Sequence, residues 1–362
     1  MPLPWTERNK YVWRFQDCTK EDVACVGGKN ANLGEMTQRG IRVPPGFAVT
    51  ADAYKEALEK SGVDNQVKRI LSSVSSRDMN SLEKASLEIR TLFESLDLPK
   101  AIEEVIDDYY TGLAERIGVS DPLVAVRSSA TAEDLPDASF AGQQDTFLGI
   151  RGHADVKKHV IKCWASLFGP RAIDYREKHG FAHDKVYISV GIQKMVNARV
   201  AGVSFTLNPI SGDPSKIAIS ATWGLGEALV SGEVTPDEWL VEKFDYEVVK
   251  KRMGSKSIQH VLERDGGVAK LEVPSEQQTT FSLTDDELTE VARICRIIEE
   301  VYGMAMDIEW AIDRDLQFPD NVFMVQARPE TVWAKKRAAV LEKSMSPTEF
   351  ILDFLKTGKK LT

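Results

Sequence analysis

The sequence predicts an α+β fold in which two subdomains enclose a cleft. Residues 51–118 have apolar positions at helical spacing, whereas residues 185–252 form a block rich in strand patterns. Helices and strands do not alternate as regular βαβ units, which disfavours one doubly wound sheet. The 362 residues are also enough for two or three packed units, at roughly 150 residues per domain.

The first 190 residues are predicted to form an N-terminal subdomain with a helical elaboration. Residues 11–15 alternate like a short strand, and the glycine-rich residues 27–34 form a turn that leads into a helix ending near Gly40. The remaining predicted elements are a proline-stiffened turn and strand at 43–50, helices within 51–118, an apolar strand at 123–126 and helices within 153–180.

Residues 191–333 are predicted to form a C-terminal subdomain, followed by a basic helical tail at 334–362. The strand patterns from the end of the first unit onward lie at 185–194, 199–207, 216–221, 237–243 and 246–252, with two more at 306–312 and 322–327. Between these groups, Thr284 and Glu287 have the spacing of a capping box, which predicts an amphipathic helix that ends at Gly303.

Composition excludes several classes of protein. The chain has 46 basic and 55 acidic residues, a net charge of −9, which disfavours binding nucleic acid through a general positive field. Its four cysteines lack metal-site or disulfide-scaffold spacing, and no signal peptide or membrane span is evident. We therefore expect a cytoplasmic protein with neither nucleic acid nor membrane as a partner.

Two basic residues are candidate phosphate ligands. Lys29 follows Gly27 and Gly28 at the start of a helix, where backbone N–H groups can bind a phosphate. The alternative is a tight turn whose lysine faces solvent. Arg127 directly follows an apolar strand, and its guanidinium suits an anion. A salt bridge from Arg127 to Glu133 or Asp134 is equally compatible with the sequence.

The last two strands carry polar residues two positions apart, which share a face of a strand. Asp307 and Glu309 form one such pair, and Gln326 and Arg328 the other. If the strands pair, one surface presents all four side chains. Their carboxylate and amide oxygens suit Mg²⁺, and the arginine suits phosphate. The alternative is a Glu–Arg salt bridge across the strands.

Residues 193–196 end a predicted strand and could hold the edge of an adenine through accessible backbone groups, although a simple strand end fits as well. The glycine-rich loop at 224–227 is a weaker signal. The five histidines lack the glycine-rich or Ser/Thr-rich setting of a phosphate acceptor; they are His153, His159, His179, His183 and His260.

Taken together, these segments resemble the nucleotide-binding domain of the phosphoenolpyruvate synthase and pyruvate phosphate dikinase family, which is also similar to rifampin phosphotransferase. The resemblance runs from about residue 11 to residue 333. The segments that carry it are residues 27–36, 43–47, 126–134, 139–146, 193–196, 208–209, 224–227, 308–311 and 325–329.

This resemblance implies an ATP-grasp-like fold that clamps Mg-ATP between two subdomains. The implied site residues are Lys29 and Arg127 for phosphates, Gly142 and Thr146 in a loop over the nucleotide, Gln193, Met195 and Val196 for adenine, Glu309 and Gln326 for Mg²⁺, and Arg328 for the transferring phosphates. Of these, Lys29, Arg127 and Arg328 would be catalytic. One departure from the family is a longer turn at residues 314–321, which bears on the position of Gln326 relative to Glu309.

The resemblance also implies that ATP is cleaved to AMP and that a pyrophosphoryl group passes to a histidine on a separate swivelling domain. Only 34 residues follow Arg328, fewer than the roughly 50 of a small domain, so we expect the acceptor histidine on a partner subunit of a hetero-oligomer. Among split enzymes, the closest resemblance is to the ATP-binding subunit of phenylphosphate synthases, which phosphorylate phenol. The alternatives are half of a split phosphoenolpyruvate synthase, a non-catalytic ATP-binding module, and an autonomous kinase or ligase.

Overall fold

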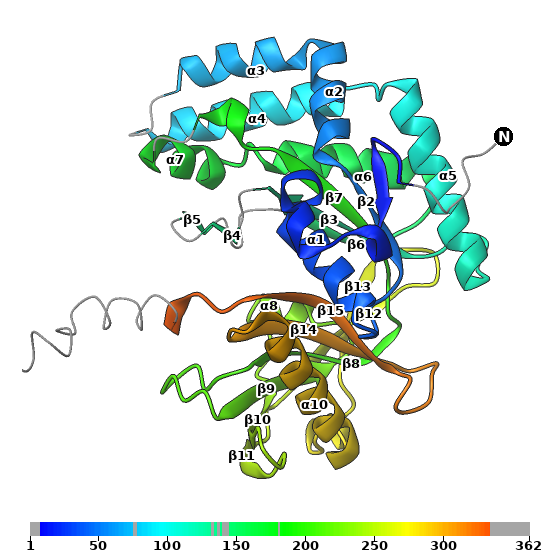
Figure 1. The fold of residues 1–362 in the computed structure, drawn as a ribbon, viewed down its shortest axis with the longest axis vertical. Helices are drawn as coiled ribbons and strands as arrows, with labels where there is room; N and C mark the ends of the chain where they lie inside the picture. The colour runs from blue at the N-terminus through cyan, green and yellow to red at the C-terminus, as the bar shows by residue number, and fades with distance from the viewer. Residues whose placement is uncertain are drawn as a thin grey trace, which may run out of the picture.

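The structure, a computed structural model, consists mainly of two antiparallel sheets with helices packed against them (Figure 1). It describes residues 8–74, 78–131, 134–135, 138–139, 145–179 and 182–333. The mixture of helix and sheet confirms the predicted α+β class. Gly142 and the predicted tail at 334–362 lie outside the described residues. Within the described part of the chain, no helix is long and apolar enough to cross a bilayer.

The first sheet has five strands. In spatial order they are β1 (Val12–Arg14), β2 (Gly46–Val49), β7 (Ile188–Lys194), β3 (Val124–Ala130) and β6 (Thr146–Ile150). The predicted subdomain boundary between residues 190 and 191 falls inside β7, all of which belongs to this sheet. Short elements beside it are η1 (Phe15–Asp17), η2 (Lys20–Asp22), η3 (His183–Lys185), β4 (Asp134–Leu135) and β5 (Ala138–Ser139).

One face of the first sheet is covered by a layer of helices. They are α2 (Ala51–Ser61), α3 (Val63–Ser72), α4 (Met79–Glu94), α5 (Lys100–Ile117), α6 (His153–Ser166) and α7 (Pro170–His179). Strand alternation explains this one-sided burial, because successive side chains point to opposite faces. In β7, Ile188, Val190 and Ile192 belong to the core beneath the helices, whereas Ser189 and Gly191 contact Asn30 on the other side.

The second sheet has six strands. In spatial order they are β11 (Val248–Arg252), β10 (Asp237–Glu242), β9 (Lys216–Trp223), β8 (Ala198–Phe205), β14 (Met306–Asp313) and β15 (Val322–Pro329). Helix α10 (Asp285–Tyr302) packs on one of its faces. The structure confirms the predicted capping box at Thr284 and the helix end at Gly303, which has a left-handed backbone.

A hairpin that the sequence reading missed connects the two sheets at one side. It consists of β12 (Ile258–Leu262) and β13 (Val268–Glu272), and the short helices α8 (Glu227–Val230) and α9 (Ser275–Gln278) lie near it in the chain. At its base, Leu225 N donates to His260 O at 2.7 Å, and at its tip Gly267 N donates to Gly149 O in β6 at 2.8 Å. The hairpin therefore joins the second subdomain to the edge of the first sheet.

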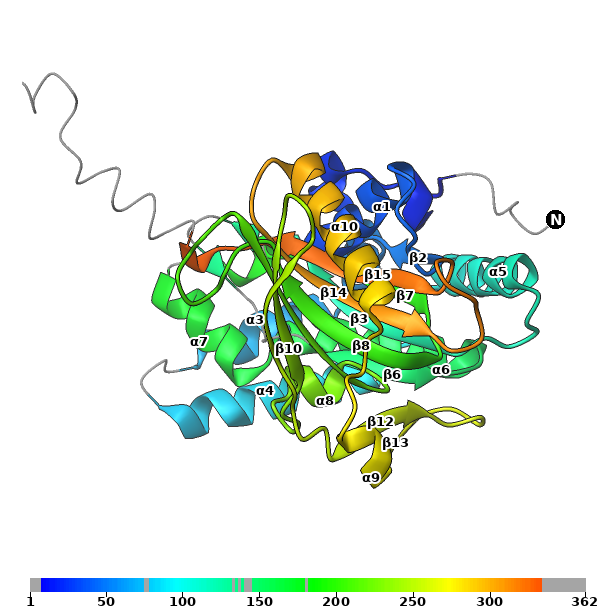
Figure 2. The ribbon, with the colours of Figure 1, turned by 90° about the horizontal axis from the view of Figure 1, so that it is seen from below.

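Helix α1 (Val23–Gln38) lies between the two sheets (Figures 1 and 2). On one side Asn30 N donates to Ser129 Oγ, and on the other Asn32 Nδ2 donates to Ala327 O at 3.0 Å. The helix begins at Val23, four residues before the predicted glycine turn, and it is broken at Gly27, where φ is 72° and ψ is 163°. Residues 28–38 therefore form a second segment whose first turn contains Lys29.

Replacing Gly27 with alanine should destabilise the fold far more than the same change at Gly40. Both glycines have a positive φ, but a Cβ at Gly27 would lie 2.2 Å from Ser129 O, whereas Gly40 has nothing within 4 Å. Gly40→Ala should cost about 1 kcal/mol for its backbone conformation, and Gly27→Ala about 3 kcal/mol or more because the clash adds to that cost. Urea unfolding measures both, and equal losses would contradict this account.

Candidate functional site

A cavity of about 430 Å³ lies between the two sheets. All the site residues implied by the resemblance that the structure describes line it together: Lys29, Arg127, Thr146, Gln193, Met195, Val196, Glu309, Gln326 and Arg328. They come from α1, from β3, β6 and β7 of the first sheet, from the segment that follows β7, and from β14 and β15 of the second sheet. Segments nearly 300 residues apart in the chain thus meet at one site.

Strand alternation directs two of these side chains into the cavity. In β3, Val124 and Val126 face the helical core, so Arg127 faces the opposite side. In β7, Ile192 faces the same core, and Gln193 faces the cavity. The apolar residues that flank each polar side chain therefore hold it on the cavity side.

Arg127 links the two sheets through hydrogen bonds to both β14 and β15. Its Nη1 donates to Val325 O at 2.8 Å and to Gln193 Oε1 at 3.2 Å. Its Nη2 donates to Gln326 Oε1 and lies 3.4 Å from Glu309 Oε2. Glu133 and the side chain of Asp134, the alternative partners considered for Arg127, are not among the described side chains.

A β-bulge makes the carbonyl of Val325 available to this arginine. Glu309 pairs with Gln326 and Trp310 pairs with Met324, so Val325 has no counterpart on β14. A bulge disrupts the ladder locally and turns one residue out of its register. The backbone oxygen of Val325 accordingly accepts a hydrogen bond from the other sheet.

The predicted pairing of the last two strands is confirmed. Glu309 stands directly opposite Gln326, and Asp307 stands opposite Arg328. The longer turn at residues 314–321 leaves this register in place. Arg328 forms an ion pair with Asp307, with Nε and Nη2 at 2.9 and 2.8 Å from Oδ2. Burial raises the pKa of the Asp307 carboxyl, and the charge of Arg328 offsets part of that effect.

The oxygen atoms of Glu309 and Gln326 fit a Mg²⁺ site that is completed by a ligand. Carboxylate and amide oxygens are preferred by Mg²⁺, which usually has few protein ligands and completes its shell with phosphate and water. Accordingly, the described residues contain no cluster of three or more His, Cys, Asp or Glu side chains suited to a metal. The guanidinium of Arg127 lies beside both oxygens, so a positive charge already occupies this position.

Lys29 lines the cavity near Arg127 and Gln326. Its Nζ donates to Ser128 O at 3.2 Å, and its position follows from the break in α1 at Gly27. Glycine is required at the break, because Gly27 has a positive φ and packs directly against Ser129. The glycine pattern therefore marks a close approach of two backbones as well as the start of a helical segment.

Part of the cavity wall is apolar, and a buried amide lines the cavity as well. Val196, Ala198, Ala201, Leu225 and Ala311 form a small hydrophobic cluster, with Met195 packed against it. Gln193 is 3% exposed, and its Nε2 has no hydrogen-bond partner in the described part of the chain. A flat apolar group with an acceptor at its edge would satisfy this amide.

The sequence predicts accessible backbone groups at residues 193–196, but two of the backbone N–H groups there are hydrogen-bonded within the protein. The N–H of Lys194 donates to Pro45 O and that of Met195 to Leu123 O, both at 2.9 Å, so these two groups are engaged within the protein. The side chain of Gln193 is therefore the better candidate for contact with a ligand than the backbone N–H groups of the two residues that follow it.

Several cavity residues were missed by the sequence reading. Leu148, Gly202 and Glu227 also line the cavity. Gly202 is required because a Cβ there would lie 2.3 Å from the ring of Trp310. The glycine-rich loop at 224–227 was a weak signal for Glu227, but no pattern in the sequence indicated Gly202.

Comparison with known proteins identifies the family. The domain described as "Pyruvate phosphate dikinase, AMP/ATP-binding domain" matches residues 23–348. The chain is 45% identical over 353 residues to the probable phosphoenolpyruvate synthase of Staphylothermus marinus, covering 91% of this chain and 42% of that protein. It is 47% identical to the probable phosphoenolpyruvate synthase of Methanothermobacter thermautotrophicus, covering 91% of this chain and 47% of that protein.

The phosphoenolpyruvate synthase of Pyrococcus furiosus is 42% identical, with 95% of this chain and 46% of that protein covered. The chain thus spans less than half the length of these relatives. The match over residues 23–348 and the agreement among the relatives lead to one assignment. This chain belongs to the family of pyruvate phosphate dikinase AMP/ATP-binding domains.

Proposed function

We propose that this chain is the ATP-binding half of a phosphoenolpyruvate-synthase-type dikinase. In this function ATP is cleaved to AMP, and the pyrophosphoryl group passes to a histidine on a partner subunit. The observation that carries the proposal is the convergence of Lys29, Arg127 and Arg328 with Glu309 and Gln326 on one cavity. Positioned cations of this kind stabilise the charge that develops during phosphoryl transfer.

Each group has a defined task in the proposed reaction. The apolar part of the cavity wall and the Gln193 amide bind and orient the adenine. Lys29, Arg127 and Arg328 bind phosphate oxygens. The histidine nitrogen bonds to the β-phosphorus, while the bond from the β-phosphorus to the oxygen that bridges it to the α-phosphorus breaks, so that AMP leaves with that oxygen. Glu309 and Gln326 would hold Mg²⁺, which neutralises phosphate charge when bound. On binding of Mg-ATP, Arg127 exchanges these two side chains for phosphate oxygens.

The acceptor histidine is proposed to lie on a partner chain. The relatives are about twice as long as the stretch matched here, which supports a further functional part outside these residues. Among the described histidines, His260 lies beside a cavity residue: its Nδ1 is 3.0 Å from Glu227 Oε2, and the side chain is 8% exposed. A buried histidine held by a carboxylate is poorly placed to receive and deliver a phosphoryl group.

The relatives favour phosphoenolpyruvate formation over phenol phosphorylation. Three matching proteins with 42–47% identity are described as phosphoenolpyruvate synthases or probable ones. The expectation of a phenylphosphate synthase subunit has no comparable support, so the first alternative replaces it as our proposal. Pyruvate is accordingly the proposed final acceptor.

Gln193→Met should weaken ATP binding roughly tenfold. The substitution keeps the length of the side chain but removes the amide that would contact adenine and that accepts a hydrogen bond from Arg127. Calorimetric titration with Mg²⁺ and a non-hydrolysable ATP analogue measures the affinity. Gln317→Met, in the exposed turn before β15, is the control and should bind normally; equal affinities would remove Gln193 from the site.

Arg328→Ala should lower the rate of AMP formation by roughly 10²–10³-fold, because a cation on the transferring phosphates is lost. Glu309→Gln should have an effect of similar size through the metal site. The matched control is Arg42→Ala, which removes an exposed arginine paired with Asp320 outside the cavity. A near-normal rate for Arg328→Ala would show that this residue does not act in catalysis.

The identity of the reaction is tested with the protein purified from its native host together with the chains that accompany it. With labelled ATP and pyruvate, the proposal predicts AMP, an acid-labile phosphohistidine on an accompanying chain, and phosphoenolpyruvate. Formation of ADP in place of AMP would contradict a dikinase. Formation of phenylphosphate from phenol, without phosphoenolpyruvate from pyruvate, would overturn the proposed substrate.

A further inference from the structure

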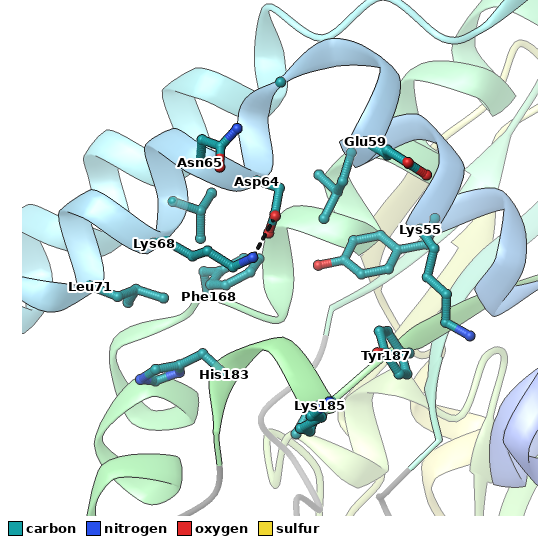
Figure 3. Close-up of a pocket in the computed structure, with 15 residues that line it drawn as sticks. Lys55, Glu59, Asp64, Asn65, Lys68, Leu71, Phe168, His183, Lys185 and Tyr187 are labelled. Atoms are coloured by element: carbon teal, nitrogen blue, oxygen red, sulfur yellow. Dashed lines mark hydrogen bonds and ion pairs between the residues drawn. The ribbon is translucent and has the colours of Figure 1, made fainter.

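The helical layer contains a second cavity, of about 440 Å³, which has about the same volume as the cavity between the two sheets (Figure 3). Its walls come from α2, α3, η3, the residue Phe168 between α6 and α7, and residues 186–187, which lead into β7. It shares no lining residue with the nucleotide cavity. In Figure 1, α2 and α3 lie on the side of the first sheet away from the six-stranded sheet.

A largely buried tyrosine contributes its hydroxyl to the wall of this cavity. Tyr54 lines it and is 3% exposed, and its ring is held edge-to-face by Trp164 with centroids 5.7 Å apart. Its hydroxyl makes no hydrogen bond to the described residues and faces the cavity, where water or a ligand can reach it. Burial raises the pKa of Tyr54, so the hydroxyl remains neutral and can donate. A ligand that offers an acceptor would satisfy it.

Charged side chains stand around the cavity, as Figure 3 shows. Lys55, Lys68 and Lys185 contribute positive charge, and Glu59 and Asp64 contribute negative charge. Lys68 is already paired with Asp64 at 2.7 Å. Lys185 has no ion-pair partner within the described ranges, so it is the lysine best placed to receive an anionic group.

The other lining residues indicate what the remainder of a bound ligand would contact. Leu58, Val67, Leu71 and Phe168 supply apolar surface beside the polar groups, which a compact apolar part of a ligand can contact. The described lining contains no arginine, which is the side chain that binds phosphate through two parallel hydrogen bonds, and its two carboxylates would repel a group with several negative charges. These features favour a single carboxylate over phosphate.

We propose that this cavity binds a small organic monocarboxylate with a compact apolar body. Its carboxylate would accept a hydrogen bond from Tyr54 and pair with Lys185, while the apolar part would contact the side chains of α2 and α3. The two cavities lie at opposite ends of β7, since Tyr187 precedes that strand and Gln193 lies near its end. The ligand should therefore bind together with ATP and not compete with it.

The test uses the full chain with a bound ATP analogue and three probes titrated by calorimetry. The probe 3-phenylpropionate carries one carboxylate, 3-phenylpropanol is its neutral counterpart, and inorganic phosphate represents the other anion class. We expect 3-phenylpropionate to bind with one-to-one stoichiometry and the other two at least tenfold more weakly. Tyr54→Phe and Lys185→Gln should each weaken it about fivefold, the value of one hydrogen bond.

Lys158→Gln, an exposed lysine of α6 outside the cavity, is the matched control and should bind normally. Tyr54→Phe should unfold at the wild-type temperature, since the lost hydroxyl has no partner in the described structure. Absence of binding, displacement by the ATP analogue, equal affinity for phosphate or the alcohol, or unchanged affinity in both Tyr54→Phe and Lys185→Gln would overturn the proposal.

Discussion

The hydrogen bonds of the Arg127 guanidinium are the contact on which the nucleotide cavity depends. The side chain starts from the first sheet and reaches a backbone oxygen and two side chains of the second. Helix α1 reinforces the same junction, because Asn30 binds the first sheet and Asn32 the second. The cavity therefore has walls from two separate cores, and its shape depends on how these cores are held together.

The electrostatics of the cavity are compensated within the protein. Arg127 lies beside Glu309 and Gln326, and Arg328 is paired with Asp307. In the function that we propose, both arginines would exchange these partners for phosphate oxygens when a nucleotide and its metal ion bring charge of both signs. This balance explains how three cationic side chains and two carboxylates coexist in a partly buried space, where unpaired charges would be costly.

Local patterns in the sequence predicted the parts of the site that lie on regular strands. The two-residue spacing of Asp307 with Glu309 and of Gln326 with Arg328 was sufficient to place them on one face. The bulge at Val325 could not be predicted, because it depends on the register between two strands. The hairpin of β12 and β13 was missed because its strands are only partly buried and lack clear alternation. The partners of Arg127 on the second sheet are about 200 residues away in the chain, which no local pattern reveals.

The central claim is that one nucleotide is held by both sheets through Lys29, Arg127 and Arg328. The most direct measurement is a crystal structure of the protein with Mg²⁺ and a non-hydrolysable ATP analogue. The account predicts adenine beside Gln193, phosphate oxygens in contact with the three cationic side chains, and the metal bound by Glu309 and Gln326. A nucleotide bound elsewhere, or one contacted by a single sheet, would contradict it.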